Sequence, residues 1–260
     1  MTVIELFNPT PKSIHDLKMS RRAGVYRITF RDETQENFNR ALKAMDYTTV
    51  YNDSPHLEII LEECDDIYEL SKMNDCNIEK VSITLCPNVV NLYGLRQIKD
   101  ITLSHCDGIT NLEEIMSIVQ KLTIISLSGV KGNSWTGLDL AGELHIERCD
   151  IGTDLSIFAR AQTLTLDRCN LNYDTSLDVS SLGSVQCLTI IHFSGLIGLG
   201  KLESVYTLKL VRTTPLMEYR KLWDIIVTSK EDSKMPNKRK AKVKTINQKK
   251  PKSKGEQAAI

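Results

Sequence analysis

The sequence predicts an α/β fold of the repeat type, a solenoid in which short strands alternate with short helical, 3₁₀ or extended segments. Three observations lead to this prediction. Apolar residues recur in one pattern about every 20 residues, most copies carry a cysteine at the same position, and both flanks have amphipathic segments suited to capping the ends. A repeat of this length indicates stacked units, because each unit buries its apolar face only against its neighbours.

Each repeat has an apolar residue, any residue, a second apolar residue, two further residues and then cysteine or another small or apolar residue. The first part predicts a strand of period two whose aliphatic side chains point into the core. The chain then turns, and the cysteine position faces inward, where a thiol can meet backbone carbonyl groups. Eight copies fit: Ile59, Leu61, Cys64; Val81, Ile83, Cys86; Ile101, Leu103, Cys106; Ile125, Leu127, Val130; Leu144, Ile146, Cys149; Leu164, Leu166, Cys169; Leu188, Ile190, Phe193; and Leu208, Leu210, Thr213. The second apolar positions are 22, 20, 24, 19, 20, 24 and 20 residues apart.

The N-terminal part, residues 1–56, is predicted to be a cap with a helix. Tyr26, Ile28 and Phe30 alternate as the residues of a strand do. A helix is expected over residues 34–45, because Thr34 is a suitable N-cap and the apolar residues that follow share one helical face. Residues 57–213 hold the repeats.

The C-terminal part has two predicted segments. Residues 214–228 are expected to form a capping helix, with Pro215 in its first turn and an apolar stripe that includes Tyr219 and Trp223. An exposed docking helix is the alternative for this stripe. Residues 229–260 are polar, rich in lysine and poor in large apolar groups, so they are predicted to be a disordered basic tail.

The repeat pattern resembles the leucine-rich-repeat superfamily, in its cysteine-containing and irregular forms, over residues 57–216. The resemblance implies a curved solenoid with a parallel β-sheet on its concave face, which such proteins typically use for protein binding, and short helical or irregular segments on the convex side. Cysteine is missing at Val130, Phe193 and Thr213, and the repeat lengths are uneven. The subclass and the curvature therefore stay open.

A column of outward strand residues just before the cysteine position is the first candidate site. It reads Glu63, Leu85, His105, Gly129, Arg148, Arg168, His192 and Arg212. With strands stacked at roughly 4.8 Å, its later half would form a positive ridge for carboxylates or phosphates. In the alternative interpretation, Arg148 and Arg168 pair with Glu147 and Asp167 on a solvated face. The predicted protein-binding residues on the concave face are His105, His145, Arg148, Thr165, Arg168, His192, Lys209 and Arg212.

The tail is the second candidate site. Its basic residues are Lys234, Lys238, Arg239, Lys240, Lys242, Lys244, Lys249, Lys250, Lys252 and Lys254, ten of the 33 in the chain, and no acid lies between them. The rest of the chain then has 23 basic against 33 acidic residues, a net charge of about −10. Such a tail suits nuclear import, contact with a nucleic-acid backbone or attraction to an acidic surface. The alternative is a solubilising tail with no partner.

Catalysis, metals and cofactors find no support in the sequence. The five histidines are scattered, and the chain contains no HExxH, Walker, GxSxG or GxGxxG motif. A straight column of inward thiols does not converge on a tetrahedral metal, so the cysteines are interpreted as buried and inert rather than metal-binding or redox-active. We expect no enzyme activity, no cofactor, no metal and no small-molecule substrate.

The favoured function is a non-catalytic scaffold that binds a protein partner on the concave face, while the basic tail localises or tethers the scaffold. If the ridge is the binding site, the partner is expected to be acidic. The alternative is a component of a ribonucleoprotein or of chromatin that contacts nucleic acid through the tail. A ubiquitin-ligase substrate adaptor is a lesser alternative, because the first 50 residues contain no convincing F-box. Neither a signal peptide nor a membrane-spanning stretch is evident, so the protein is expected in the cytoplasm or nucleus.

Overall fold

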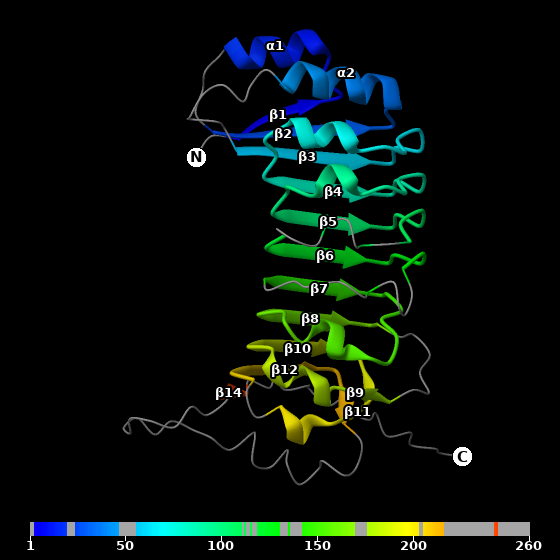
Figure 1. Ribbon diagram of the computed structural model, residues 1–260, viewed down its shortest axis with the longest axis vertical. Coiled ribbons are helices and arrows are strands. Elements are labelled where there is room, and N and C mark those ends of the chain that lie inside the picture. The colour runs from blue at the N-terminus through cyan, green and yellow to red at the C-terminus, as the bar shows by residue number, and fades with distance from the viewer. Residues whose placement is uncertain are drawn as a thin grey trace, which may run out of the picture.

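The computed structural model describes residues 3–19, 24–46, 56–110, 119–130, 142–169, 176–202, 205–215 and 242–243, with single residues at 112, 115 and 135. Within these residues the chain is an α/β structure with an eleven-stranded parallel sheet, in the order β1-β2-β3-β4-β5-β6-β7-β8-β10-β12-β14. The strands stack along the long axis of the molecule, and two helices lie at the N-terminal end (Figure 1). A repeat-like parallel sheet is therefore confirmed. Its curvature stays a prediction.

The strands are short because each spans only the apolar-any-apolar segment of its repeat and one residue on either side. Ile59, Val81 and Ile101 pair in register on consecutive strands and are fully buried. In-register pairing makes columns of aliphatic side chains that form one continuous core. The strands are β1 (Val3–Phe7), β2 (Val25–Arg31), β3 (His56–Glu62), β4 (Lys80–Thr84), β5 (Asp100–Ser104), β6 (Lys121–Ile125), β7 (Glu143–Glu147), β8 (Thr163–Asp167), β10 (Cys187–Ile191), β12 (Thr207–Val211) and β14 (Lys242–Val243).

The predicted register of the fourth repeat was wrong by three residues. Leu122 pairs with Ile101, and Ile124 pairs with Leu103, so these residues, and not Ile125 and Leu127, are the buried strand positions. Leu127, and not Val130, takes the cysteine position of this repeat, and it is buried. Both triplets have the same spacing of apolar residues, and only pairing with β5 distinguishes them. The corrected spacing between second apolar positions is 22, 20, 21, 22, 20, 24 and 20 residues.

The cysteine position forms the inward corner that follows each strand. Cys106 and Cys169 donate hydrogen bonds to the carbonyl oxygens of Ser104 (3.2 Å) and Asp167 (3.5 Å), each two residues earlier. Each also donates to a carbonyl of the preceding strand, that of Ile83 (3.5 Å) for Cys106. The expected contact between inward thiols and backbone carbonyl groups is confirmed.

Buried thiols predict a loss of stability in alkali. Burial raises the pKa of Cys149 to about 11 and that of Cys169 to about 12, from 9.0 for an exposed thiol. Above pH 9.0 the unfolded chain loses its thiol protons, while the folded chain keeps those of Cys149 and Cys169 up to their raised pKa values. The free energy of unfolding therefore falls as the pH rises above 9.0. Urea denaturation across this range should show a steeper decline for the natural protein than for a Cys149→Ala, Cys169→Ala variant. Equal slopes would contradict the assignment.

The segments opposite the sheet are short, as expected. The 3₁₀ turns are η2 (Ser71–Asp75), η3 (Tyr93–Leu95), η6 (Leu155–Phe158), η7 (Ser180–Ser184) and η8 (Leu199–Lys201). A second parallel sheet joins β9 (Leu177–Asp178), β11 (Ser194–Ile197) and β13 (Thr214–Pro215), in the order β13-β11-β9. These connections bring the leucine and isoleucine residues of successive repeats together beneath the main sheet.

The N-terminal part extends the same sheet. Strand β1, helix α1 (Pro11–Met19), strand β2 and helix α2 (Gln35–Asp46) follow one another, and β1 and β2 pair in parallel. Helix α2 begins where it was expected, because the Asn37 amide donates to the Thr34 hydroxyl oxygen (3.3 Å). Phe38 at the start of this helix packs edge-on against Phe30 of β2, with ring centroids 5.1 Å apart. Neither β1 nor α1 was predicted.

Only four residues of the predicted capping helix and tail, residues 214, 215, 242 and 243, are among the described residues. Thr214 and Pro215 form strand β13 beside β11, so the expected helix start at these two residues is wrong. Lys242 and Val243 form strand β14 beside β12, so the expected disorder is wrong there. The rest of the predicted capping helix and of the tail, including Tyr219 and Trp223, lies outside the described residues.

Candidate functional site

The candidate ridge lies at the carboxyl ends of the strands, in a bend rather than within the strands. The residue after each strand of the main sheet from β3 to β12 has a left-handed backbone, with φ between 51° and 59°. In the fourth repeat this residue is Ser126, which corrects Gly129. The bend column therefore consists of Glu63, Leu85, His105, Ser126, Arg148, Arg168, His192 and Arg212.

A left-handed backbone is costly for these residue types. It destabilises a residue other than glycine by roughly 1–2 kcal/mol, and asparagine tolerates it best. Asn8 and Asp32 take this conformation after β1 and β2, but from β3 onward the bend column contains neither glycine nor asparagine, and four of its last five members are arginine or histidine. Strained residues concentrate at functional sites. The arginine and histidine side chains in this conformation thus support the bend column as a candidate binding surface.

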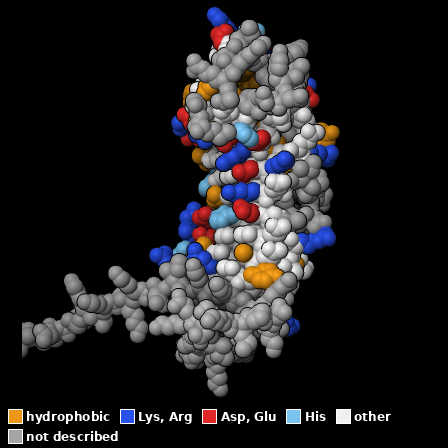
Figure 2. All heavy atoms as spheres, turned by 90° about the vertical axis from the view of Figure 1, so that its left-hand side faces the viewer, with side chains coloured by type: hydrophobic (Ala, Val, Ile, Leu, Met, Phe, Trp, Pro, Cys, Tyr) orange, Lys and Arg blue, Asp and Glu red, His pale blue; other side chains and the backbone are white. Residues whose placement is uncertain are grey.

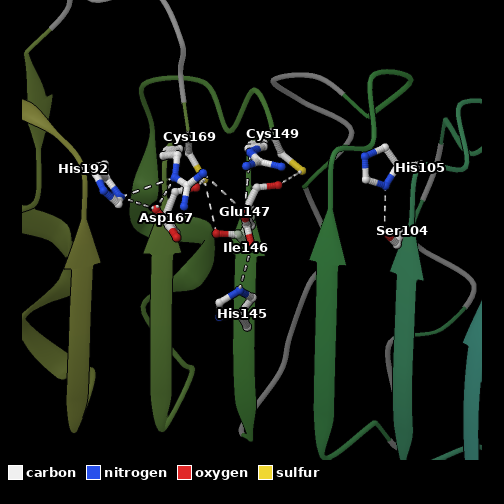
Figure 3. A network of polar contacts seen from close by, with 11 residues as sticks. Ser104, His105, His145, Ile146, Glu147, Cys149, Asp167, Cys169 and His192 are labelled. Carbon is white, nitrogen blue, oxygen red and sulfur yellow. Dashed lines mark hydrogen bonds and ion pairs between the residues drawn. The ribbon is translucent and has the colours of Figure 1, made fainter. Parts of the chain in front are cut away.

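The last four members of the bend column, here the basic ridge, are Arg148, Arg168, His192 and Arg212. They lie beside two acids at the ends of adjacent strands. These are Glu147 of β7 and Asp167 of β8, which Figure 3 shows with His192. Arg148 Nε is 3.5 Å from Glu147 Oε1, and Arg168 Nε is 3.2 Å from Asp167 Oδ1. The pairs expected under the alternative interpretation are therefore present. The ridge has both charges, with arginine in excess.

Asp167 is the centre of this network. It is 8% exposed, while the arginine side chains around it are more open to solvent. Its Oδ1 lies 2.9 Å from His192 Nδ1, and Arg212 Nη1 lies 3.2 Å from His192 Nε2. Arg168 Nε also points at His192 Nδ1 from 3.4 Å, so each ring nitrogen faces an arginine, and Nδ1 lies between Arg168 and Asp167. Asp167 thus orients His192, which in turn holds Arg212.

The other predicted site residues fall into two places. His145, Thr165 and Lys209 lie in the central outward column of the sheet, where Thr189, which was not predicted, separates Thr165 from Lys209. His145 Nε2 is 3.9 Å from Glu147 Oε2, so it borders the ridge. His105 lies apart, because Ser126 of the intervening repeat separates it from Arg148 in the bend column. Its Nδ1 contacts the Ser104 hydroxyl at 2.8 Å instead.

A third column, at the first outward position of the strands, was missed. It alternates in charge and reads Glu5, Arg27, Glu58, Lys80, Asp100, Lys121 and Glu143, here the charge ladder. Arg27 contacts both Glu5 (2.8 Å) and Glu58 (3.0 Å). Figure 2 shows basic and acidic side chains alternating along this surface. Opposite charges on neighbouring strands stabilise each pairing slightly and disfavour wrong ones. The wrong register of the fourth repeat hid Lys121 and with it the alternation.

Other kinds of site find little support in the described residues. They contain no group of three or more histidine, cysteine or acidic side chains placed to hold a metal ion. In the cysteine column, the neighbouring Cys86 thiol lowers the pKa of Cys64, yet Cys64 is fully buried. None of the described helices has the length and apolar character needed to cross a membrane. The predicted lysine clusters of the tail, apart from Lys242, lie outside the described residues.

The comparisons with known proteins do not assign the chain to a family. No protein-family model matches the sequence, and neither the curated proteins nor the solved structures contain a match. The class that the fold defines is thus an α/β protein with a repeat-like parallel sheet.

Proposed function

We propose that the protein is a non-catalytic scaffold of the leucine-rich-repeat type that binds an acidic segment of a protein partner at the basic ridge. The Lys-rich tail then serves to localise or tether the complex. The observation that carries the proposal is the alignment of Arg148, Arg168, His192 and Arg212 at the ends of consecutive strands, in a backbone conformation that disfavours these residues.

The charge balance of the ridge favours an acidic partner. Three arginines face two carboxylates, those of Glu147 and Asp167. Among the described residues, no carboxylate lies within 4.0 Å of the Arg212 guanidinium group, whose hydrogen-bond partner is His192. Ion pairs between exposed groups are typically worth up to about 1 kcal/mol. An incoming carboxylate can therefore bind Arg212 and replace the weaker internal pairs of Arg148 and Arg168.

The spacing of the ridge suits a helix laid along the stack. Neighbouring strands lie roughly 4.8 Å apart, so Arg168, His192 and Arg212 repeat at that distance. Acidic residues three or four apart on one face of a helix are separated by about 5–6 Å. An amphipathic helix with an acidic stripe can thus present successive carboxylates to successive members of the ridge.

The test is affinity capture from the native cell followed by a binding measurement with the captured protein. We expect an Arg148→Glu, Arg168→Glu, Arg212→Glu variant to weaken binding about tenfold or more, because each substitution sets like charges against the partner. Truncation after Thr228 should leave that partner bound.

A matched control separates the ridge from a general charge effect. Lys43, Lys72 and Lys99 are exposed lysines away from the ridge, and their joint replacement by glutamate changes the net charge by the same amount. This variant should bind almost as the natural protein does. If both triple variants lose binding equally, or if only truncation releases the partner together with nucleic acid, the ridge is not the site.

A further inference from the structure

The main sheet has an open edge at strand β1. This strand is the first in the sheet order and pairs on one side with β2. The Asn8 amide donates to the Thr29 carbonyl oxygen of β2 at 2.8 Å. Because successive peptide groups of a strand point to opposite sides, the amide and carbonyl groups of Glu5 and Phe7 point away from β2. Among the described residues, no strand pairs with them.

The composition of β1 offers little protection against pairing. Val3 and Phe7 are 48% and 63% exposed, and the strand contains no proline or lysine. Such apolar edges are templates for another strand. Glu5 is the first member of the charge ladder. A strand added beside β1 therefore continues the alternation of charge if it places a basic residue next to Glu5.

The opposite end of the sheet has a strand with this property. Strand β14 is the last in the sheet order and runs parallel to β12, with Lys242 paired with Thr207 and Val243 paired with Leu208. Thr207 belongs to the same column as the charge ladder, and Leu208 to the buried column that begins at Leu6. At the ladder position the two ends of the sheet therefore carry Lys242 and Glu5, and at the next position Val243 and Leu6.

We propose that copies of this chain associate head to tail, with β14 of one copy pairing in parallel with β1 of the next. In this register Lys242 takes the ladder position beside Glu5, which is followed by Arg27, and Val243 takes the position beside Leu6. All strands keep the same direction across the junction. A contact of this kind uses two different surfaces and need not close, so it produces chains of varying length.

A symmetric pair of β1 strands is the other way to cover this edge. An antiparallel pairing centred on Glu5 sets two Glu5 side chains opposite one another, and like charges placed so are destabilising. The head-to-tail arrangement avoids this repulsion and joins the first strand of the sheet order to the last.

Sedimentation equilibrium of the full chain over a wide concentration range tests the proposal. The average mass should rise with concentration above the 29.4 kDa of one chain, without levelling at a dimer. A natural protein that stays monomeric throughout, or one that levels at a dimer, overturns the proposal.

Two sets of variants locate the contact. Phe7→Pro removes an amide that points to the open edge and should abolish association, whereas Phe7→Ala keeps this amide and should associate. Glu5→Lys and Lys242→Glu should each weaken association about threefold to tenfold, and the double variant should recover part of it, because Glu5→Lys also breaks the pair that Glu5 makes with Arg27. Association by Phe7→Pro as strong as that of the natural protein, or no recovery in the double variant, contradicts this geometry. Circular dichroism confirms that each variant is folded.

Discussion

A Trp135→Ala substitution should lower the free energy of unfolding by about 3–5 kcal/mol. Trp135 is fully buried and is the largest fully buried side chain among the described residues. Its ring meets that of Phe158 edge-on, with centroids 5.7 Å apart, and its Nε1 donates to the Asp150 carbonyl oxygen at 2.8 Å. The substitution removes the ring contacts, leaves a cavity and deprives the Asp150 carbonyl group of its donor.

Urea denaturation followed by circular dichroism measures this loss, and Trp135→Phe is the matched control. Phenylalanine keeps an aromatic ring against Phe158 but cannot donate to Asp150, so the loss should be about 1–3 kcal/mol. If alanine and phenylalanine destabilise equally, the hydrogen bond outweighs the packing. If neither destabilises, Trp135 does not occupy this site.

The second large effect is expected from Gly94→Ala, which should destabilise the protein by about 3 kcal/mol. Gly94 lies in η3, where a Cβ atom would come within 1.8 Å of the Leu70 carbonyl oxygen. That oxygen belongs to the preceding repeat and already accepts the Met73 amide at 2.8 Å. Neither backbone can move alone, so two packed repeats must separate.

Gly200→Ala provides the control, measured by the same denaturation. Gly200 is also in a 3₁₀ turn, η8, but a Cβ atom there would meet nothing within 4 Å. Alanine restricts the unfolded chain, so stability should stay constant or rise by up to about 1 kcal/mol. A Gly94→Ala variant as stable as Gly200→Ala would contradict the close stacking of these repeats.

The candidate site could be predicted only in part. The sequence placed Arg148, Arg168, His192 and Arg212 in one column, and the structure aligns them at consecutive strand ends. It placed them on the strands, however, because spacing alone does not reveal the left-handed bend. The contacts of Asp167 with His192 and of His192 with Arg212 join side chains of neighbouring repeats, and the spacing of residues in the sequence does not predict them.

The sequence by itself determined the short strands and their repeat, since alternating aliphatic residues define strands and a repeat near 20 residues leaves stacking as the way to bury them. Only the tertiary structure decided the register of the fourth repeat, because Leu122 and Ile125 fit the pattern equally well and pairing with β5 distinguishes them. It alone also revealed the charge ladder and the open edge at β1. Both depend on which residues, about 20 positions apart, become neighbours across the sheet.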